Sequence, residues 1–193
     1  MTAAAIRTRL RAARRAVPGR DARSAAHAAV ERSLELGLFE DLPEVALSVC
    51  DDGELDPGPL AVVLRETGHR SWYPVVGSVD DDPPMTFRHW DGSTPLEAGR
   101  FGIPVPPAGA PELAAEDLSA VVMPLVAFDL SGHRLGRGAG YYDRTFAPRG
   151  TDRRSGPLLV GWAYDFQQVE NLDVQAWDVP LDYVVTPTTV HRF

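Results

Sequence analysis

The sequence contains no lysine, and all 19 of its basic residues are arginine. This absence excludes every mechanism that depends on a lysine side chain. One of these is the phosphate-binding motif GxxxxGK[ST], whose lysine reaches the outer phosphates of a nucleotide. Because alanine is also abundant, we attribute the loss of lysine to genomic base composition. An anionic ligand must therefore be bound by arginine side chains or by backbone N–H groups.

Cysteine is almost absent. The single Cys50 excludes an internal disulfide and a metal site made of several cysteines. Because Cys50 ends the apolar run VALSVC at residues 45–50, we expect a buried structural thiol and a cytoplasmic location. The N-terminal residues are rich in alanine and arginine and lack an acid before Asp21. That composition is also typical of a transit peptide, so this alternative stays open.

Long hydrophobic runs are absent as well. The longest, residues 120–128, is too short to span a membrane and contains Pro124. The N-terminus lacks the apolar segment of a secretory signal. With 44% hydrophobic residues in a chain of 193, we expect one compact domain over residues 1–193, no membrane partner and a monomer.

The net charge of −8 is unevenly distributed. Residues 1–35 hold eight arginines against three acidic residues, a net charge of +5, whereas the rest of the chain carries −13. An acidic body argues against nucleic-acid binding, which needs a basic surface. The basic N-terminal segment is suited to one anionic ligand.

Apolar runs alternate with helical patterns along the chain. This alternation predicts an α/β fold: a three-layer, Rossmann-like, mainly parallel sheet with helices on both faces. Helices are predicted at 2–17, 21–38, 56–69 and from residue 141. Strands are predicted at 45–50, 71–76, 85–90, 118–129, 157–165 and 182–187. A turn is predicted at 77–84 and an irregular segment at 91–118. Strand 118–129 is the most apolar and should lie mid-sheet. Ligands of such folds bind beyond the carboxyl ends of the strands.

The stretch GHRLGRGAGYYDR, residues 132–144, follows this central strand directly. It does not match the dinucleotide fingerprint GxGxxG, because Tyr141 stands where the third glycine is needed. Its glycines favour a nest of backbone N–H groups for an anion, followed by a helix N-terminus. Arg134 and Arg137 add cations that bind phosphate, and Asp143 is a carboxylate suited to Mg²⁺. A glycine-rich turn with solvated arginines and no ligand remains the alternative.

The longer run VVMPLVAFDLSGHRLGRGAGYYDR resembles the signature of the 5-formyltetrahydrofolate cyclo-ligase family, also called methenyltetrahydrofolate synthetase. The resemblance extends over nearly the whole chain, including IRTRLRAARRAV, MTFRHW and FGIPVPP. It implies an enzyme that uses ATP and Mg²⁺ to convert 5-formyltetrahydrofolate into 5,10-methenyltetrahydrofolate, releasing ADP and phosphate. In the implied mechanism the formyl oxygen is phosphorylated and the second folate nitrogen then closes the ring. The alternative is a paralogue that binds nucleotide or pterin without turnover.

The resemblance also assigns roles to individual residues. ATP is bound by Arg7, Arg134, Gly136, Arg137, Gly138, Ala139, Gly140 and Tyr141; the folate by Glu54, Phe101 and Tyr142; the metal by Asp143 and Asp182; and the catalytic residues are Arg134, Tyr142 and Asp143. From the residues alone, Arg7 could instead be solvated, Asp182 could merely flank a strand, and Phe101 could belong to the core.

Four positions depart from the family pattern. Ala3 stands where the family has a phosphate-binding lysine, which an arginine at 7, 9 or 11 would have to replace. Val105 replaces a Glu or Gln, Trp177 replaces a His, and Pro57 replaces a Thr. The departures therefore affect the folate side and the lysine position, whereas the glycine-rich loop is intact.

Overall fold

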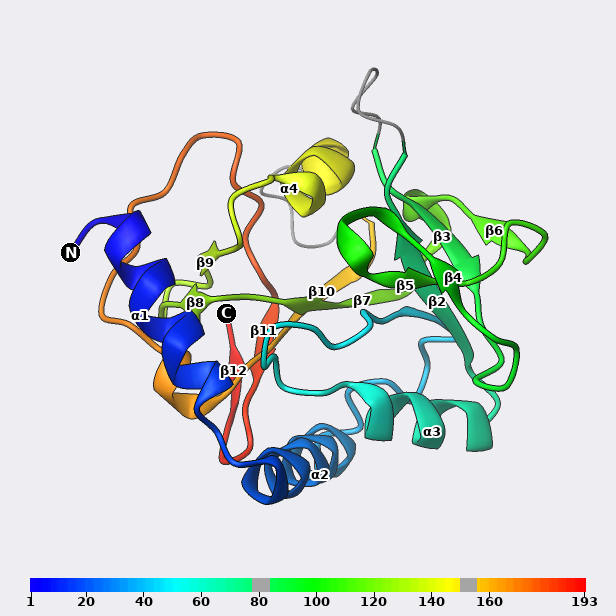
Figure 1. Cartoon of the computed structure of the whole chain (residues 1–193), viewed down its shortest axis with the longest axis horizontal. Helices are drawn as coiled ribbons and strands as arrows, with labels where there is room; N and C mark the ends of the chain where they lie inside the picture. Colours follow the sequence, from blue (N-terminus) through cyan, green and yellow to red (C-terminus); the bar gives the residue numbers. More distant parts are fainter. Residues whose placement is uncertain (78–83, 150–155) are drawn as a thin grey trace.

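The computed structural model describes residues 1–77, 84–149 and 156–193 (Figure 1). The turn predicted at 77–84 lies mostly outside these residues. An eight-stranded sheet forms the centre, with the order β12-β11-β10-β7-β1-β2-β3-β6. Its strands are β1 (Glu44–Ala46), β2 (Arg70–Val75), β3 (Thr86–His89), β6 (Glu112–Leu113), β7 (Ala120–Pro124), β10 (Leu158–Trp162), β11 (Tyr183–Val185) and β12 (Val190–Arg192).

The five inner strands, from β11 to β2, are parallel, and the strands at both edges are antiparallel. β7 lies fourth in the order, which confirms the predicted central strand. That predicted strand is nevertheless divided. β7 ends at Pro124, which has no N–H to continue the ladder, and the chain then forms the hairpin of β8 (Ala127–Phe128) and β9 (Arg134–Leu135).

The segment 91–118, predicted to be irregular, contains three short strands. β4 (Glu97–Ala98) pairs with β5 (Pro104–Val105), and β6 extends the edge of the main sheet through β3. The C-terminal β12 was not predicted either. These pairings are two or three residues long, so the sequence carries too short a pattern to indicate them.

Helices cover both faces of the sheet, as predicted (Figure 1). Along β1, Val45 contacts the core beneath α2 (Gly19–Glu35) and α3 (Gly58–Glu66), whereas Ala46 points to the opposite core, which contains Phe146 of α4 (Tyr141–Phe146). This alternation follows from the two-residue period of a strand. With six residues, α4 is too short to add much of a helix dipole to the glycine-rich loop.

Helix α1 (Ala3–Arg15) lies beside the end of the sheet, next to β8 (Figure 1). Ile6 and Leu10 are buried against Val126 and Ala127, so the helix presents its other face, rich in arginine, to the loops beyond the strands. No helix among the described residues is long and apolar enough to cross a membrane.

Candidate active site

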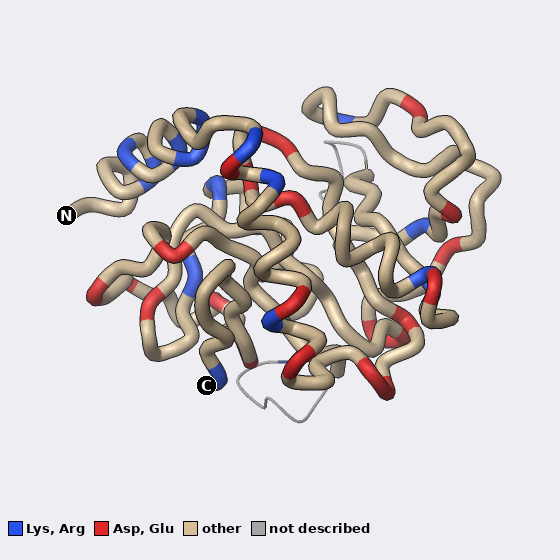
Figure 2. Tube along the Cα trace, turned by 90° about the horizontal axis from the view of Figure 1, so that it is seen from below, with Lys and Arg blue, Asp and Glu red and all other residues tan. Residues whose placement is uncertain are grey.

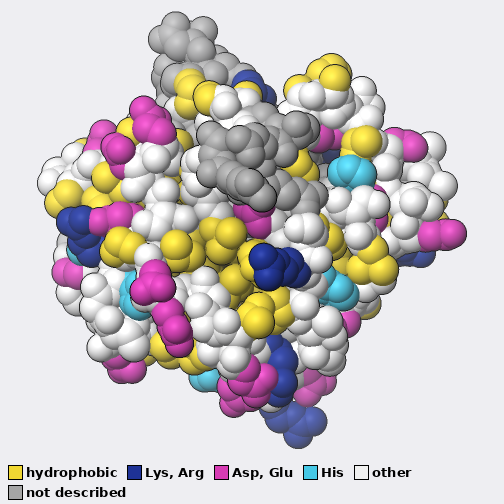
Figure 3. Space-filling view, turned by 180° about the vertical axis from the view of Figure 1, so that it is seen from behind, with side chains coloured by type: hydrophobic (Ala, Val, Ile, Leu, Met, Phe, Trp, Pro, Cys, Tyr) yellow, Lys and Arg dark blue, Asp and Glu magenta, His cyan; other side chains and the backbone are white. Residues whose placement is uncertain are grey.

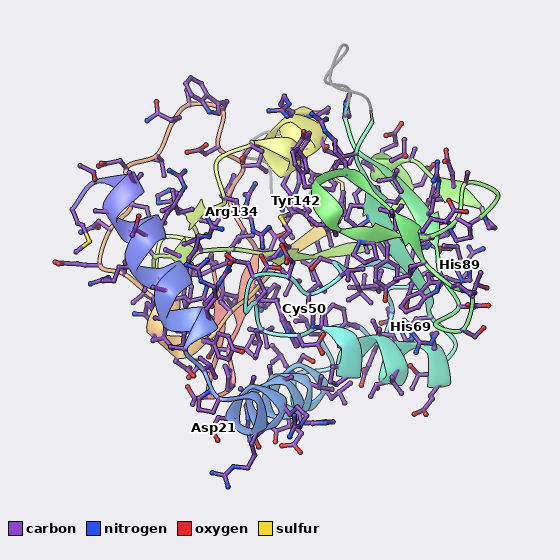
Figure 4. The ribbon with its side chains drawn as sticks, in the orientation of Figure 1. Asp21, Cys50, His69, His89, Arg134 and Tyr142 are labelled. Carbon is purple, nitrogen blue, oxygen red and sulfur yellow. The ribbon has the colours of Figure 1, made fainter. Side chains whose placement is uncertain are left out.

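Two loops meet at the carboxyl edge of the parallel strands, one after β1 and one after β7. Arg14 of α1 connects them and is 1% exposed. Its guanidinium donates to the Leu125 carbonyl at 3.0 Å and to Oδ2 of Asp52 at 2.9 Å. Figure 4 shows Arg134 and Tyr142 near the start of α4, with Cys50 on the side of α2 and α3. Helix α1, the loop of residues 51–54 (the acidic loop) and the glycine-rich loop are joined into one site by Arg14, Arg7 and Arg137.

Asp52 is the main anchor of α1. Besides Arg14, it accepts hydrogen bonds from Arg11 at 2.7 Å and from Arg15 at 3.0 Å. Burial opposes ionisation of this carboxyl, but the hydrogen bonds and charges of Arg11 and Arg14 outweigh it and lower the pKa of Asp52. Figure 2 shows the basic positions along α1 beside this acidic segment. On the opposite face of the molecule from that in Figure 1, basic and acidic side chains are interspersed (Figure 3).

Arg7 contacts the glycine-rich loop directly. Its Nε donates to the Gly136 carbonyl at 2.8 Å, which excludes the alternative of a solvated side chain. Gly138 has a φ of 111°, and a Cβ at this position would lie 3.7 Å from the Arg7 guanidinium. Gly140, at the start of α4, has a φ of 69°. Both backbone conformations favour glycine, so the loop passes under Arg7 with its backbone accessible.

Arg137 joins the glycine-rich loop to the acidic loop. One nitrogen donates to Oδ2 of Asp51 at 2.7 Å, and the other lies 3.2 Å from Oε1 of Glu54. Glu54 is 8% exposed and is also 3.7 Å from Arg14. Burial raises the pKa of Glu54, against the opposing charges of Arg137 and Arg14.

Tyr142 faces the same region. Burial raises the pKa of its phenol above the usual range, and the Glu54 carboxylate raises it further, against the opposing charge of Arg134. Its ring stacks on Phe146 with centroids 6.4 Å apart. The hydroxyl therefore stays protonated at neutral pH and can donate a hydrogen bond.

Phe101 is exposed, so its predicted alternative as a core residue is excluded. Its side chain is 65% exposed, and its φ of 59° is rare for a residue other than glycine. The ring lies 6.1 Å from that of Tyr141, and the Arg100 guanidinium lies 4.7 Å above it. A strained, exposed aromatic residue beside the site is a candidate to stack on a flat ligand.

Arg134 and Asp143 form an ion pair. Nη2 of Arg134 donates to Oδ1 of Asp143 at 2.6 Å, and the Val179 N–H donates to the same oxygen at 3.2 Å. The other terminal nitrogen of Arg134 donates to the Val179 carbonyl. The proposed phosphate-binding cation and the proposed metal ligand are therefore paired in this structure.

Asp182 is buried at the start of β11. Its Oδ1 accepts from Arg149 at 2.5 Å and its Oδ2 from the Leu159 N–H at 2.7 Å. Within the described ranges, no group of three or more His, Cys, Asp or Glu side chains gathers in a way that could hold a metal. Asp143, with a partly exposed carboxylate, fits a Mg²⁺ held by one protein ligand, phosphates and water. Asp182, in this arrangement, holds Arg149.

Cys50 is exposed, so the predicted buried thiol is wrong. Strand β1 ends at Ala46 and the chain leaves the sheet before residue 50. Although Cys50 is exposed, its thiol is expected to be weakly reactive, because little of it is ionised at neutral pH. Burial of part of the side chain and the nearby Asp56, Glu54 and Asp51 raise the pKa of the thiol to about 11, against the charge of Arg14.

Sequence reasoning missed Asp51, Asp52 and Arg14. The sequence did contain a signal for them: the acidic run DDGE directly follows a predicted strand, and the N-terminal segment with a net charge of +5 is its electrostatic complement. Asp129, which lies in the signature run, was not assigned a role from the sequence. It is buried and accepts from the backbone N–H groups of Ser131 and His133, which fixes the turn that leads into the glycine-rich loop.

Two of the positions that depart from the family pattern, Ala3 and Trp177, are accessible. Ala3 lines a cavity of about 610 Å³ together with Arg9 and the segment 168–173, so a longer side chain has room there. Trp177 is 68% exposed. Arg9 lines the same cavity as Ala3, whereas Arg7 contacts Gly136 and Arg11 binds Asp52.

The fold is that of an α/β protein with an arginine- and glycine-rich loop at the carboxyl edge of its parallel sheet. A model of the 5-formyltetrahydrofolate cyclo-ligase family matches residues 2–187. The chain therefore belongs to that family.

Individual relatives agree. The 5-formyltetrahydrofolate cyclo-ligase of Escherichia coli K12 is 38% identical over 147 residues, which cover 76% of this chain and 79% of the relative. That of Haemophilus influenzae is 32% identical over 177 residues, 91% of this chain and 92% of the relative. The NMR structure of Aquifex aeolicus 5,10-methenyltetrahydrofolate synthetase superposes with a TM-score of 0.82 at 31% identity, covering 100% of this chain and 93% of that one. A synthetase from Mycoplasma pneumoniae, 23% identical, shares the fold with a TM-score of 0.74 over 97% of this chain and 99% of that one.

Proposed function

We propose that the protein is an ATP-dependent 5-formyltetrahydrofolate cyclo-ligase that forms 5,10-methenyltetrahydrofolate, ADP and phosphate. The observation that carries this proposal is the family match over residues 2–187, together with the folding of the signature loop at the carboxyl edge of the sheet. The γ-phosphoryl group is transferred to the formyl oxygen, which turns that oxygen into a leaving group. The second folate nitrogen attacks the formyl carbon and loses its proton, and the C–O bond breaks with release of phosphate.

Such a reaction needs positioning and charge neutralisation rather than a protein nucleophile. The glycine-rich loop supplies backbone N–H groups at Gly136, Gly138 and Gly140, flanked by Ala139 and Tyr141. Arg7 reaches the loop from α1 through the Gly136 carbonyl, and Arg134 and Arg137 belong to the loop itself, where they pair with Asp143 and Asp51. Three arginines around one backbone loop are suited to a triphosphate.

The folate side is formed by Glu54, Tyr142 and Phe101. Glu54 is a buried acceptor for ring N–H groups, the protonated Tyr142 hydroxyl is a donor, and Phe101 is an exposed ring for stacking. When bound, Mg²⁺ would neutralise charge on the transferred phosphoryl group, with Asp143 as its protein ligand. Asp182 stays a predicted second ligand, which requires Arg149 to release it.

The test is the absorbance of the methenyl product when protein, MgATP and 5-formyltetrahydrofolate are mixed. We expect product to appear with all three and none when ATP is omitted. Binding of MgATP without any absorbance change would contradict the proposed activity and favour a binding paralogue. A monomeric state and a cytoplasmic location stay predictions, and light scattering measures the first.

A further inference from the structure

We infer that Arg137 couples the nucleotide site to the folate site by exchanging partners between Glu54 and the ATP phosphates. The inference rests on the proposed function but goes beyond it, because it assigns Arg137 and Asp51 a role in communication between the two sites. It starts from the observation that one arginine of the glycine-rich loop is held by carboxylates of the opposite loop.

Glu54 has few free acceptor positions while Arg137 is bound. Its Oε1 faces Arg137 at 3.2 Å and Arg14 at 3.7 Å. Its Oε2 accepts from the Asp51 N–H at 3.3 Å. A folate ring that donates an N–H group to Oε1 of Glu54 therefore competes with Arg137, the more exposed of the two arginines.

Asp51 holds Arg137 in the resting position. Its Oδ2 accepts from the guanidinium at 2.7 Å, and its backbone forms a turn with Glu54, whose N–H donates to the Asp51 carbonyl at 3.0 Å. Asp51 and Glu54 thus contact different nitrogens of the same guanidinium. A lysine ammonium has a single nitrogen and cannot contact both carboxylates in this way. No proposed ligand contact involves Asp51, so it acts as a positioning residue.

Arg137 also belongs to the loop that is proposed to bind phosphate. Its side chain is 34% exposed and stands between Gly136 and Gly138, so rotation about its side-chain bonds can release it from the acidic loop to bind a phosphate. Phosphates that bind Arg137 leave Glu54 free for the folate, and a folate that binds Glu54 leaves Arg137 free for phosphates. Each ligand therefore raises the affinity for the other by the same factor.

The experiment is a calorimetric measurement of the Kd of 5-formyltetrahydrofolate with and without a saturating non-hydrolysable ATP analogue and Mg²⁺. We expect the analogue to tighten folate binding by at least about fivefold in the natural protein. Arg137→Gln should bring this ratio to about one, and Arg137→Lys should restore only part of it. Asp51→Asn should tighten analogue binding in the absence of folate and lower the ratio.

The matched control is Arg15→Gln, because Arg15 binds the same acidic loop through Asp52 and should keep the natural ratio. Binding of both ligands to the natural protein with a ratio of one overturns this inference and leaves the proposed function intact. A natural ratio in Arg137→Gln overturns it as well. Failure of the natural protein to bind the analogue overturns both the inference and the proposed function.

Discussion

The Arg134 guanidinium and the Asp143 carboxylate form an ion pair of 2.6 Å at the end of the glycine-rich loop. Arg134 is 6% exposed and also donates to the Val179 carbonyl. The proposed phosphate ligand and the proposed metal ligand therefore neutralise each other before substrates bind. The proposed binding of MgATP would exchange this pair for contacts of Arg134 with phosphate and of Asp143 with the metal.

Asp143→Asn tests the metal assignment. Asparagine keeps an acceptor for the Val179 N–H but loses the charge that a metal needs. We expect turnover to fall at least about a hundredfold, measured from the absorbance of the methenyl product. Asp178→Asn is the control, because the Asp178 carboxylate accepts from the nearby Gln175 N–H, which an asparagine can also do, and turnover should stay normal. Near-normal turnover in Asp143→Asn would show that the assignment is wrong.

Gly53→Ala tests how closely α1 approaches the acidic loop. Gly53 has a φ of 70°, and a Cβ there would lie 2.9 Å from backbone atoms of Arg14 and Arg15. Gly68 has a φ of 89° but open space around it, so Gly68→Ala carries the backbone penalty without the collision. In urea unfolding we expect a loss of about 3 kcal/mol for Gly53→Ala and about 1 kcal/mol for Gly68→Ala. Equal losses would contradict the close approach.

Asp52 makes the docking of α1 dependent on pH. Its pKa in the folded protein is below the ordinary value of 3.8, so the folded state favours the carboxylate. The resulting stability is fully present above pH 3.8 and is lost as the pH falls through the folded pKa. Asp52→Asn should therefore be clearly less stable than the natural protein at pH 7, and the difference should shrink below pH 4. Denaturant unfolding of both proteins from pH 7 to pH 3 measures it; a constant difference would rule out this linkage.

Ala3→Lys tests the position of the missing lysine. Ala3 lines a cavity of about 610 Å³ and precedes Arg7 by four residues, so a lysine there lies on the same face of α1. We expect a lower KM for ATP, measured with the absorbance assay at saturating folate. Ala5→Lys adds the same charge at an exposed position and should leave KM unchanged. An unchanged KM for Ala3→Lys would mean that an arginine already serves this position.

Much of the fold could be predicted from the sequence, because the patterns that indicate its strands and loops lie within short segments of the chain. The apolar run around Val122 gave the central strand, and glycines at 136, 138 and 140 gave the loop. Strand ends were less predictable: β1 stops at Ala46 rather than at Cys50, because pairing partners rather than local composition decide where a ladder ends. Short pairings such as β6 with β3 depend entirely on where distant segments meet.

The sequence by itself determined the class of fold, the absence of lysine chemistry and the identity of the loop, since these depend on composition, periodicity and motif. Only the tertiary structure decided which arginine meets which acid. Eight arginines in the first 35 residues look alike in the sequence, yet in the structure Arg7 binds Gly136 and Arg14 is buried against Asp52. Outside this segment, Arg137 binds Asp51, 86 residues away in the chain, and Glu54. Ion pairs of this kind join elements that are remote in the chain, so they exist only once the core has packed and brought the strand ends together.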